Sequence, residues 1–186
     1  MGSVYWFLTG AQLQIVQVFQ DLWGWSVLNA ALHCIPIGVA GGLSSHLTGI
    51  FGPRIPRRLL LLLGQVPLII AAALFATADT PHKYWTHFLP GMIVGIWSLA
   101  LAYVAANISL MSIAHPGEEG VMGALMNTAF QLGSTIGAAV MTAITLGVNE
   151  NQPKDAVSQF KGYAMGFWSL VAIHGLCSIM VAICIK

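Results

Sequence analysis

Residues 52–77 read GPRIPRRLLLLLGQVPLIIAAALFAT, and this stretch decides the fold class. Three arginines near its start are followed by a run from Leu59 to Thr77 that carries no charge. The hydrocarbon core of a bilayer is roughly 30 Å thick, so a helix that crosses it needs about 20 mostly apolar residues. The stretch therefore predicts a transmembrane helix that follows a short basic hinge.

The rest of the chain repeats this pattern of long apolar stretches between short polar hinges. Hydrophobic residues make up 57% of the 186 residues and charged residues only 7%, and the mean hydropathy is +0.80. Soluble domains carry about 25% charged residues. We predict an all-α membrane protein with a single domain over residues 1–186. Its six transmembrane helices are expected at about residues 3–20, 26–51, 58–77, 84–113, 121–148 and 163–185.

The basic residues predict how the chain is oriented. Arg54, Arg57 and Arg58 lie in the hinge between the second and third predicted helices, and the positive-inside rule places such a cluster in the cytoplasm. Six spans return the chain to its starting side, so both termini are expected in the cytoplasm as well. Residues 149–161 form the longest polar connection, which we predict to be an exposed loop on the outer side.

Polar side chains inside the predicted helices indicate where a binding site lies. Amides and imidazoles are costly in lipid and normally face protein or water. They concentrate in the first, second, fourth and fifth predicted helices, whereas the third and sixth hold little beyond Gln65 and His174. We expect the first group to surround a polar cavity and the other two helices to face lipid. The candidate cavity residues are Gln12, Gln17, His33, Asn107, Asn127 and Gln131.

Some of these residues have two interpretations, which the sequence leaves open. Asn127 and Gln131 share one helical face with Ser134, and this face is either the wall of a substrate cavity or a hydrogen-bonding contact between helices. His33 either carries a proton or is bonded to a neighbouring helix. Gly133 and Gly137 have the spacing of small residues that allows close helix packing, and we expect them to serve packing.

Several functional classes find no support in the sequence. No nucleophile with a base, no paired carboxylates and no phosphate-binding glycine loop is recognisable, so we expect no enzymatic activity. The net charge near +1 gives no sign of nucleic-acid binding. The histidines lack the spacing of metal ligands, and neither a metal nor a cofactor is expected. The acidic residues all lie outside the predicted spans or at their edges.

Three stretches resemble the major facilitator superfamily. The region from Gly41 to Gly64, with its basic run, resembles the helix–loop–helix hinge of these transporters. Residues 120–137, GVMGALMNTAFQLGSTIG, are similar to the penultimate helix of fungal drug:proton antiporters with fourteen spans. Residues 81–85 and 89–92 fit the same branch, which includes exporters of the aminotriazole-resistance type. The resemblance covers nearly the whole chain and corresponds to the C-terminal six-helix half of that fold.

The resemblance implies a multidrug-resistance type of function. A half-transporter of this kind takes part in proton-coupled export of small organic compounds, by alternating access as two six-helix halves rock. The implied partners are membrane lipid, a small organic substrate, protons, and a second six-helix half or a second copy of the chain. The implied location is the plasma membrane or the vacuolar membrane.

Two departures from the family pattern leave another interpretation open. Residues 46–49 stand where the family hinge carries an acidic residue, and the N-terminal half with its antiporter motif is not part of this sequence. The alternative is a membrane protein that does not transport, or a truncated relic, which packs against partner helices.

Overall fold

The structure is a computed structural model that describes residues 2–150 and 152–184, apart from the side chains of Arg57 and Cys184. All regular elements of this described part are helical. The helices are α1 (Gly2–Trp6), α2 (Gln12–Gln17), α3 (Val27–Phe51), α4 (Arg57–Ala76), α5 (Phe88–Met111), α6 (Glu119–Asn149) and α7 (Ala156–Cys184). Two π-helical segments, Phe7–Ala11 and Val18–Leu22, continue α1 and α2. Residues 2–22 therefore form one helical unit, here called the first rod.

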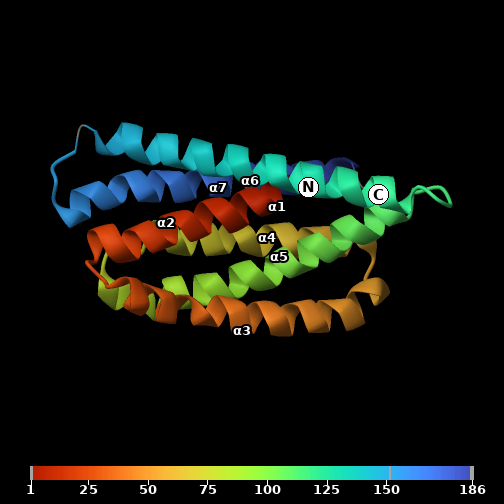
Figure 1. The fold of residues 1–186 in the computed structure, drawn as a ribbon, viewed down its shortest axis with the longest axis horizontal. Coiled ribbons are helices and arrows are strands. Elements are labelled where there is room, and N and C mark those ends of the chain that lie inside the picture. The colour runs from red at the N-terminus through yellow and green to blue at the C-terminus, as the bar shows by residue number, and fades with distance from the viewer. Residues whose placement is uncertain (1, 151, 185–186) are drawn as a thin grey trace.

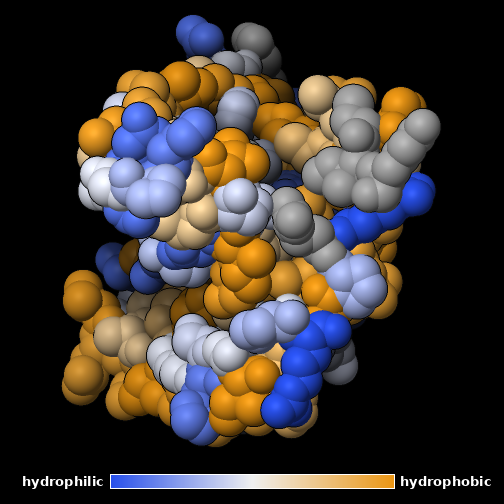
Figure 2. Space-filling model, turned by 90° about the vertical axis from the view of Figure 1, so that its right-hand side faces the viewer, coloured by the Kyte–Doolittle hydropathy of each residue, from blue (hydrophilic) through white to orange (hydrophobic). Residues whose placement is uncertain are grey.

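The helices lie side by side along the long axis of the molecule (Figure 1). The hinges at residues 52–56 and 112–118 lie at one end, here called the hinge end, and the connections at 23–26, 77–87 and 150–155 lie at the other. Hydrophilic groups gather at the hinge end, whereas large parts of the surrounding surface are hydrophobic (Figure 2). This distribution is the one expected of a bundle whose ends reach water on the two sides of a membrane.

Five described segments are long and apolar enough to cross a membrane: Val27–Arg54, Arg58–Ala76, Pro81–Met111, Glu119–Asn149 and Ala156–Ile183. The first rod, which the π-helical segments divide, is not among them. The all-α membrane fold predicted from the sequence is confirmed, while the first rod as a sixth span stays a prediction.

The observed helix ends differ from the predicted spans at two places. α7 begins at Ala156, seven residues before the predicted start, because the Asp155 carboxylate accepts a hydrogen bond of 3.0 Å from the backbone N–H of Ser158 and caps the helix. Residues 156–161 are therefore helical, and the prediction of a loop across 149–161 was wrong there. α5 begins at Phe88 instead of residue 84, because Pro81–Tyr84 forms a separate 3₁₀ turn.

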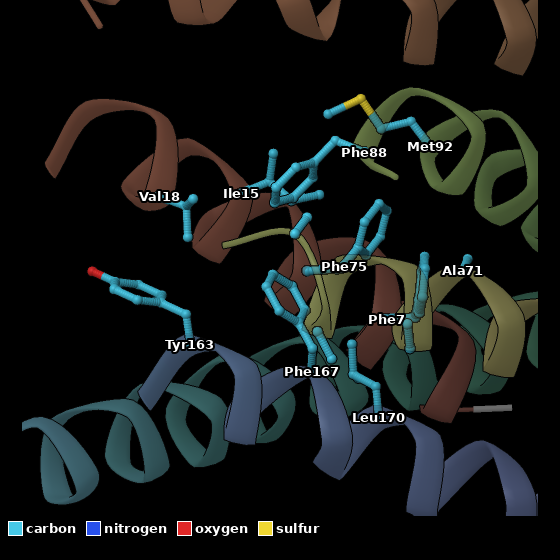
Figure 3. Close-up of a cluster of buried hydrophobic side chains, with 14 of the residues drawn as sticks. Phe7, Ile15, Val18, Ala71, Phe75, Phe88, Met92, Tyr163, Phe167 and Leu170 are labelled. Atoms are coloured by element: carbon cyan, nitrogen blue, oxygen red, sulfur yellow. The ribbon is translucent and has the colours of Figure 1, made fainter. Parts of the chain in front are cut away.

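Aromatic side chains fill the space where the first rod, α4, α5 and α7 meet. Phe7, Phe75, Phe88 and Phe167 converge there from these four units (Figure 3). The ring centroid of Phe75 lies 5.4 Å from that of Phe88 and 5.5 Å from that of Phe167. This cluster fixes α4 between α5 and α7 and gives the first rod a rigid support.

The outward faces of α4 and α7 are apolar. On α4 the exposed large side chains are Leu59, Leu63, Val66 and Ile70, and on α7 they include Leu176, Ile179, Met180 and Ile183. Side chains of this kind are the ones that lipid contact favours. The arrangement supports the expectation that these two helices face lipid.

Candidate functional site

A row of three hollows lies along the first rod, beside α3 and α5. Its wider section, of about 650 Å³, is lined by residues that include Gln12, Gln20 and Cys34. A second section of about 350 Å³ lies between Tyr5 and Tyr103 and includes Ser44 and Ser45 of α3. A small hollow shares the lining residue Gln12 with the wider section, and Ile96 and Leu99 with the second section. We refer to the whole as the central groove.

α6 flanks the first rod and presents a polar strip. Asn127 and Gln131 are exposed on this strip, and the Ser134 hydroxyl lies 2.7 Å from the Thr9 hydroxyl of the first rod. That bond fixes the strip beside the first rod. Within the described residues, neither amide side chain is hydrogen-bonded to another group. Both amides are therefore free to bind a substrate, water or another polypeptide.

An aromatic stack links three helices close to the central groove. The ring of Phe130 on α6 lies 4.4 Å from that of Tyr5 and 5.5 Å from that of Tyr103, measured between centroids. Tyr103 is exposed, and Asn107 lies one helical turn further along α5, half-exposed. Sequence reasoning missed the stack because its rings come from distant helices without a shared spacing.

His33 and Gln17 lie apart from the polar strip of α6. His33 Nδ1 is 2.9 Å from the carbonyl oxygen of Asn29, and its ring packs against Trp25, with 4.3 Å between centroids. The Tyr84 hydroxyl donates to the His33 backbone carbonyl at 2.8 Å. Gln17 is half-buried, about 140° around the helix from Gln12. The structure does not bring these two candidates together with Asn127 and Gln131.

Two buried amides join helices inside the bundle, and sequence reasoning gave them no role. The Gln14 amide of the first rod donates to the Met141 carbonyl at 3.1 Å and to the Thr145 hydroxyl. Gln65 of α4 lies 2.7 Å from His174 of α7. Because the oxygen of the Gln65 amide only accepts, His174 Nδ1 is the donor. Polar residues in these spans therefore serve packing as well as the open groove.

Gly133 and Gly137 lie where the first rod crosses α6. A Cβ atom on Gly133 would lie 2.6 Å from the Cα atom of Gly2, and one on Gly137 would lie 2.8 Å from the Cα atom of Trp6. Real Cβ atoms do not come so close to backbone atoms. Both glycines therefore lie at the closest approach of the two helices.

The three hinge arginines differ in their surroundings. Arg54 is exposed, and its guanidinium carbon lies 5.9 Å from the centre of the Phe51 ring. Arg58 donates to the backbone carbonyl of Ala182 at 3.0 Å, which ties the end of α7 to the start of α4. Arg57 is the first residue of α4.

Comparison with known proteins identifies the family of the chain. The model of the Major Facilitator Superfamily matches residues 1–138. The efflux pump terJ of Aspergillus terreus is 30% identical over 156 residues, which are 81% of this chain and 28% of that protein. The puromycin resistance protein pur8 of Streptomyces alboniger is 28% identical over 75% of this chain and 28% of its own length.

A third relative is named for a different substrate. The low affinity ammonium transporter of Saccharomyces cerevisiae is 24% identical over 86% of this chain and 30% of its own length. The chain thus spans less than a third of each of these three relatives. Since the family model covers most of the 186 residues, the chain belongs to the Major Facilitator Superfamily of membrane transporters.

Proposed function

We propose that the chain is the C-terminal six-helix half of a proton-coupled exporter of small organic compounds, of the fungal drug:proton antiporter type with fourteen spans. The main observation that supports this proposal is the open polar strip of α6. Asn127 and Gln131 are exposed beside the first rod, whereas the exposed faces of α4 and α7 are apolar. An unpaired amide is costly in lipid, so this strip needs a polar substrate, water or a second polypeptide.

The names of the relatives support the substrate class. terJ is an efflux pump and pur8 is a puromycin resistance protein, and both names fit the export of organic compounds. The ammonium transporter shows that similar chains handle different substrates. We therefore assign a class of substrate and not one compound.

The residues of the central groove and those of the neighbouring helix α6, which do not line it, divide the work of binding. The amides of Gln12, Asn127 and Gln131 offer both donors and acceptors, while the stack of Tyr5, Phe130 and Tyr103 offers flat apolar surface. In a complete carrier the opposing half closes over this face. Rocking of the two halves then exposes the site alternately to the two sides of the membrane, and each opening lets the amides exchange substrate for water.

In this proposal, the coupled proton is carried by a group other than the acidic residues of this half. The carboxylates of Asp21, Glu119 and Asp155, like the other acidic side chains, lie at the ends of helices or in connections. A carboxylate inside the membrane is a common proton carrier. We therefore place the carboxylate that carries the proton on a separate six-helix half of different sequence, since a second copy of this chain would add no carboxylate inside the membrane.

The proposed location is the plasma membrane or the vacuolar membrane. The hinge with Arg54 and Arg58 faces the cytoplasm in this proposal, because basic loops are retained on that side. The end of α7 lies at the same end of the bundle, since Arg58 bonds to Ala182. The carboxyl end of the described chain is then cytoplasmic as well.

A chimera tests the proposal. The chain replaces the aligned segment of the puromycin resistance protein, and the chimera is expressed in puromycin-sensitive bacteria. We expect it to confer resistance, and we expect Asn127→Leu and Gln131→Leu to lower that resistance at least tenfold at equal membrane level. Ile136→Ala changes an exposed residue on the apolar side of the same helix and should not alter resistance.

The outcomes separate the two interpretations of the polar strip. If both amide variants fail to reach the membrane, the strip serves assembly with the other half. If both reach the membrane and confer full resistance, the amides have no role in transport and the proposed site is wrong. A chimera that assembles stably without conferring resistance would favour the protein that packs against partner helices and does not transport.

A further inference from the structure

A second groove lies on the outer flank of the bundle, between α3, α4 and α5. Its volume is about 510 Å³ and its walls are almost entirely apolar. It shares no lining residue with the central groove. Among the residues that line it are Thr48, Phe51, Leu63, Pro67, Trp97 and Leu101. We refer to it as the flank groove.

The flank groove runs from the hinge end into the interior of the membrane region. Phe51 and Ile55 line it beside the hinge, and Pro67 lines it ten residues after the start of α4 at Arg57. At 1.5 Å per residue, this distance is about 15 Å. The lining side chain of Leu63 also belongs to the exposed apolar face of α4. The groove thus runs along the membrane normal, as a lipid acyl chain does, and its walls are apolar like the acyl chains of a bilayer.

A positive charge lies at the mouth of the flank groove. The Arg54 guanidinium lies over the ring of Phe51, 5.9 Å from its centre, and Phe51 lines the groove. Arg54 is exposed, and no carboxylate of residues 2–150 or 152–184 forms an ion pair with it. Its donors are available to an anion at the membrane surface.

A buried hydroxyl without a partner lies in the same wall. Thr48 is 3% exposed and lines the flank groove, and its Oγ1 atom has no hydrogen-bond partner in the described part of the chain. Thr48 precedes Phe51 by three residues, which is about 4.5 Å along the helix axis. A buried hydroxyl normally has a partner. The ester carbonyl oxygen of a phospholipid lies below its phosphate and would accept this hydrogen bond once the Thr48 side chain rotates to turn its buried hydroxyl into the groove.

We propose that the flank groove binds an anionic phospholipid. One acyl chain fills the apolar walls, the ester carbonyl accepts a hydrogen bond from Thr48, and the phosphate is held by Arg54. Basic pockets between transmembrane helices on the cytoplasmic side suit anionic head groups. The site is separate from the central groove, so the proposal does not depend on the substrate of the carrier.

Native mass spectrometry of the purified full chain tests the head-group preference. The chain in detergent is titrated with dioleoylphosphatidylglycerol and, separately, with dioleoylphosphatidylcholine, which has the same acyl chains. We expect the phosphatidylglycerol complex to form at several-fold lower lipid concentration. Equal binding of the two lipids would overturn the assignment of an anionic head group.

The charge at the mouth is tested by substitution of Arg54. Removal of one basic residue near anionic lipid costs about 1 kcal/mol, so Arg54→Gln should weaken phosphatidylglycerol binding about fivefold. It should weaken phosphatidylcholine binding less, because the choline cation already offsets the charge of that phosphate. Arg54→Lys should restore most of the preference. Lys161→Gln removes one exposed charge near the start of α7, away from the hinge end, and serves as the matched control. A preference that survives in Arg54→Gln would overturn the proposal.

The walls of the groove are tested in the same titrations. Thr48→Val and Leu63→Trp should each weaken the binding of both lipids several-fold, since these residues contact the ester and the acyl chain. The ratio of the two affinities should not change. Leu176→Trp places the same bulk on the exposed face of α7 and should have no effect. Circular dichroism verifies that every variant folds. Folded Thr48→Val and Leu63→Trp variants that bind both lipids like the original chain would show that the flank groove is not the site.

Discussion

Gln12 and Gln14 stand two residues apart on the first rod but have opposite surroundings. Gln12 is exposed in the central groove, whereas Gln14 is buried and its amide donates to Met141 and Thr145 of α6. A Cβ atom on Gly166 of α7 would lie 2.5 Å from the Gln14 amide nitrogen, so the side chain is enclosed by three helices. Gln14 is therefore a structural contact, and Gln12 is available to a ligand.

This difference predicts the effects of two matched substitutions. Gln14→Leu should lower the free energy of unfolding by about 0.6 kcal/mol for each hydrogen bond lost, the average between membrane helices, and by at most about 1.7 kcal/mol for each. Gln12→Leu should change it by less than about 0.5 kcal/mol, because the side chain is exposed. Thermal unfolding of the purified chain in detergent measures both. Equal losses in the two variants would contradict the separate roles.

The carboxylate of Asp155 predicts a pH dependence at the start of α7. The backbone N–H of Ser158, and then its side-chain hydroxyl, lower the pKa of the Asp155 carboxyl below its ordinary value. The ionised form therefore stabilises the first turn at pH values above the pKa of the unfolded chain, about 3.9, and this stabilisation is lost as the pH falls through the lower folded pKa. Hydrogen exchange at the Ser158 amide should show a falling protection factor on acidification.

The control for this measurement is Asp155→Asn. An asparagine oxygen still accepts a hydrogen bond from Ser158 but does not titrate. The acid-induced fall in protection should therefore disappear in this variant. A fall that persists there would assign the pH dependence to another group.

At this scale the sequence predicts less than the structure reveals. Helical geometry places Gln12 and Gln14 about 200° apart, but the sequence alone does not say which of them faces the neighbouring helices. Asn127 and Gln131 were placed on one face by their spacing, and they are exposed together. Gln65 and His174 bond across two helices, and no local pattern in the sequence joins positions so far apart.

At the scale of elements, the contact between the first rod and α6 depends on small residues. Gly133 and Gly137 meet Gly2 and Trp6, and Met141 meets Gly10 one turn further on. These contacts let the backbones approach closely, as small residues do between membrane helices. The first rod can therefore lie directly against the polar strip of α6.

Two glycines of the same helix provide a matched test of this packing. Gly137→Ala places a methyl group against the Trp6 backbone and should destabilise the chain by about 1–3 kcal/mol, as overpacking does. Gly147→Ala meets nothing within 4 Å and should be neutral or stabilise by up to about 1 kcal/mol. Chemical unfolding in detergent measures the difference. A neutral Gly137→Ala variant would show that this contact does not hold the first rod.

Helix positions were largely predictable because uninterrupted apolar runs mark them. The start of α7, residues 156–161, was missed since it contains the polar and charged residues Ser158, Gln159 and Lys161. The cap residue Asp155 was a signal that could have found it. The π-helical segments at Phe7–Ala11 and Val18–Leu22 have no recognised signal in the sequence.

At the scale of the whole molecule, two opposite kinds of surface coexist. One carries the central groove and the amides of α6, and the other consists of the apolar outer faces of α4 and α7. The uneven distribution of amides predicts this division, which stays a prediction because α3 and α6 also expose large apolar side chains, among them Leu32 and Ile136. The flank groove was not predictable, because it depends on how α3, α4 and α5 diverge near the hinge end and not on any one residue pattern.

The two ends of the bundle predict a pattern of chemical accessibility. His115 lies exposed in the connection before α6, and Ala156 lies exposed at the start of α7, so α6 separates them. In a variant without Cys34, Cys177 and Cys184, a cysteine introduced by Ala156→Cys should react with an impermeant maleimide on intact cells. One introduced by His115→Cys should react only after permeabilisation, because its end carries the arginines that the positive-inside rule retains in the cytoplasm. Leu68→Cys, at a fully buried position, should react in neither case. The reverse pattern would invert the orientation, and reaction of both from the same side would show that α6 does not cross the membrane.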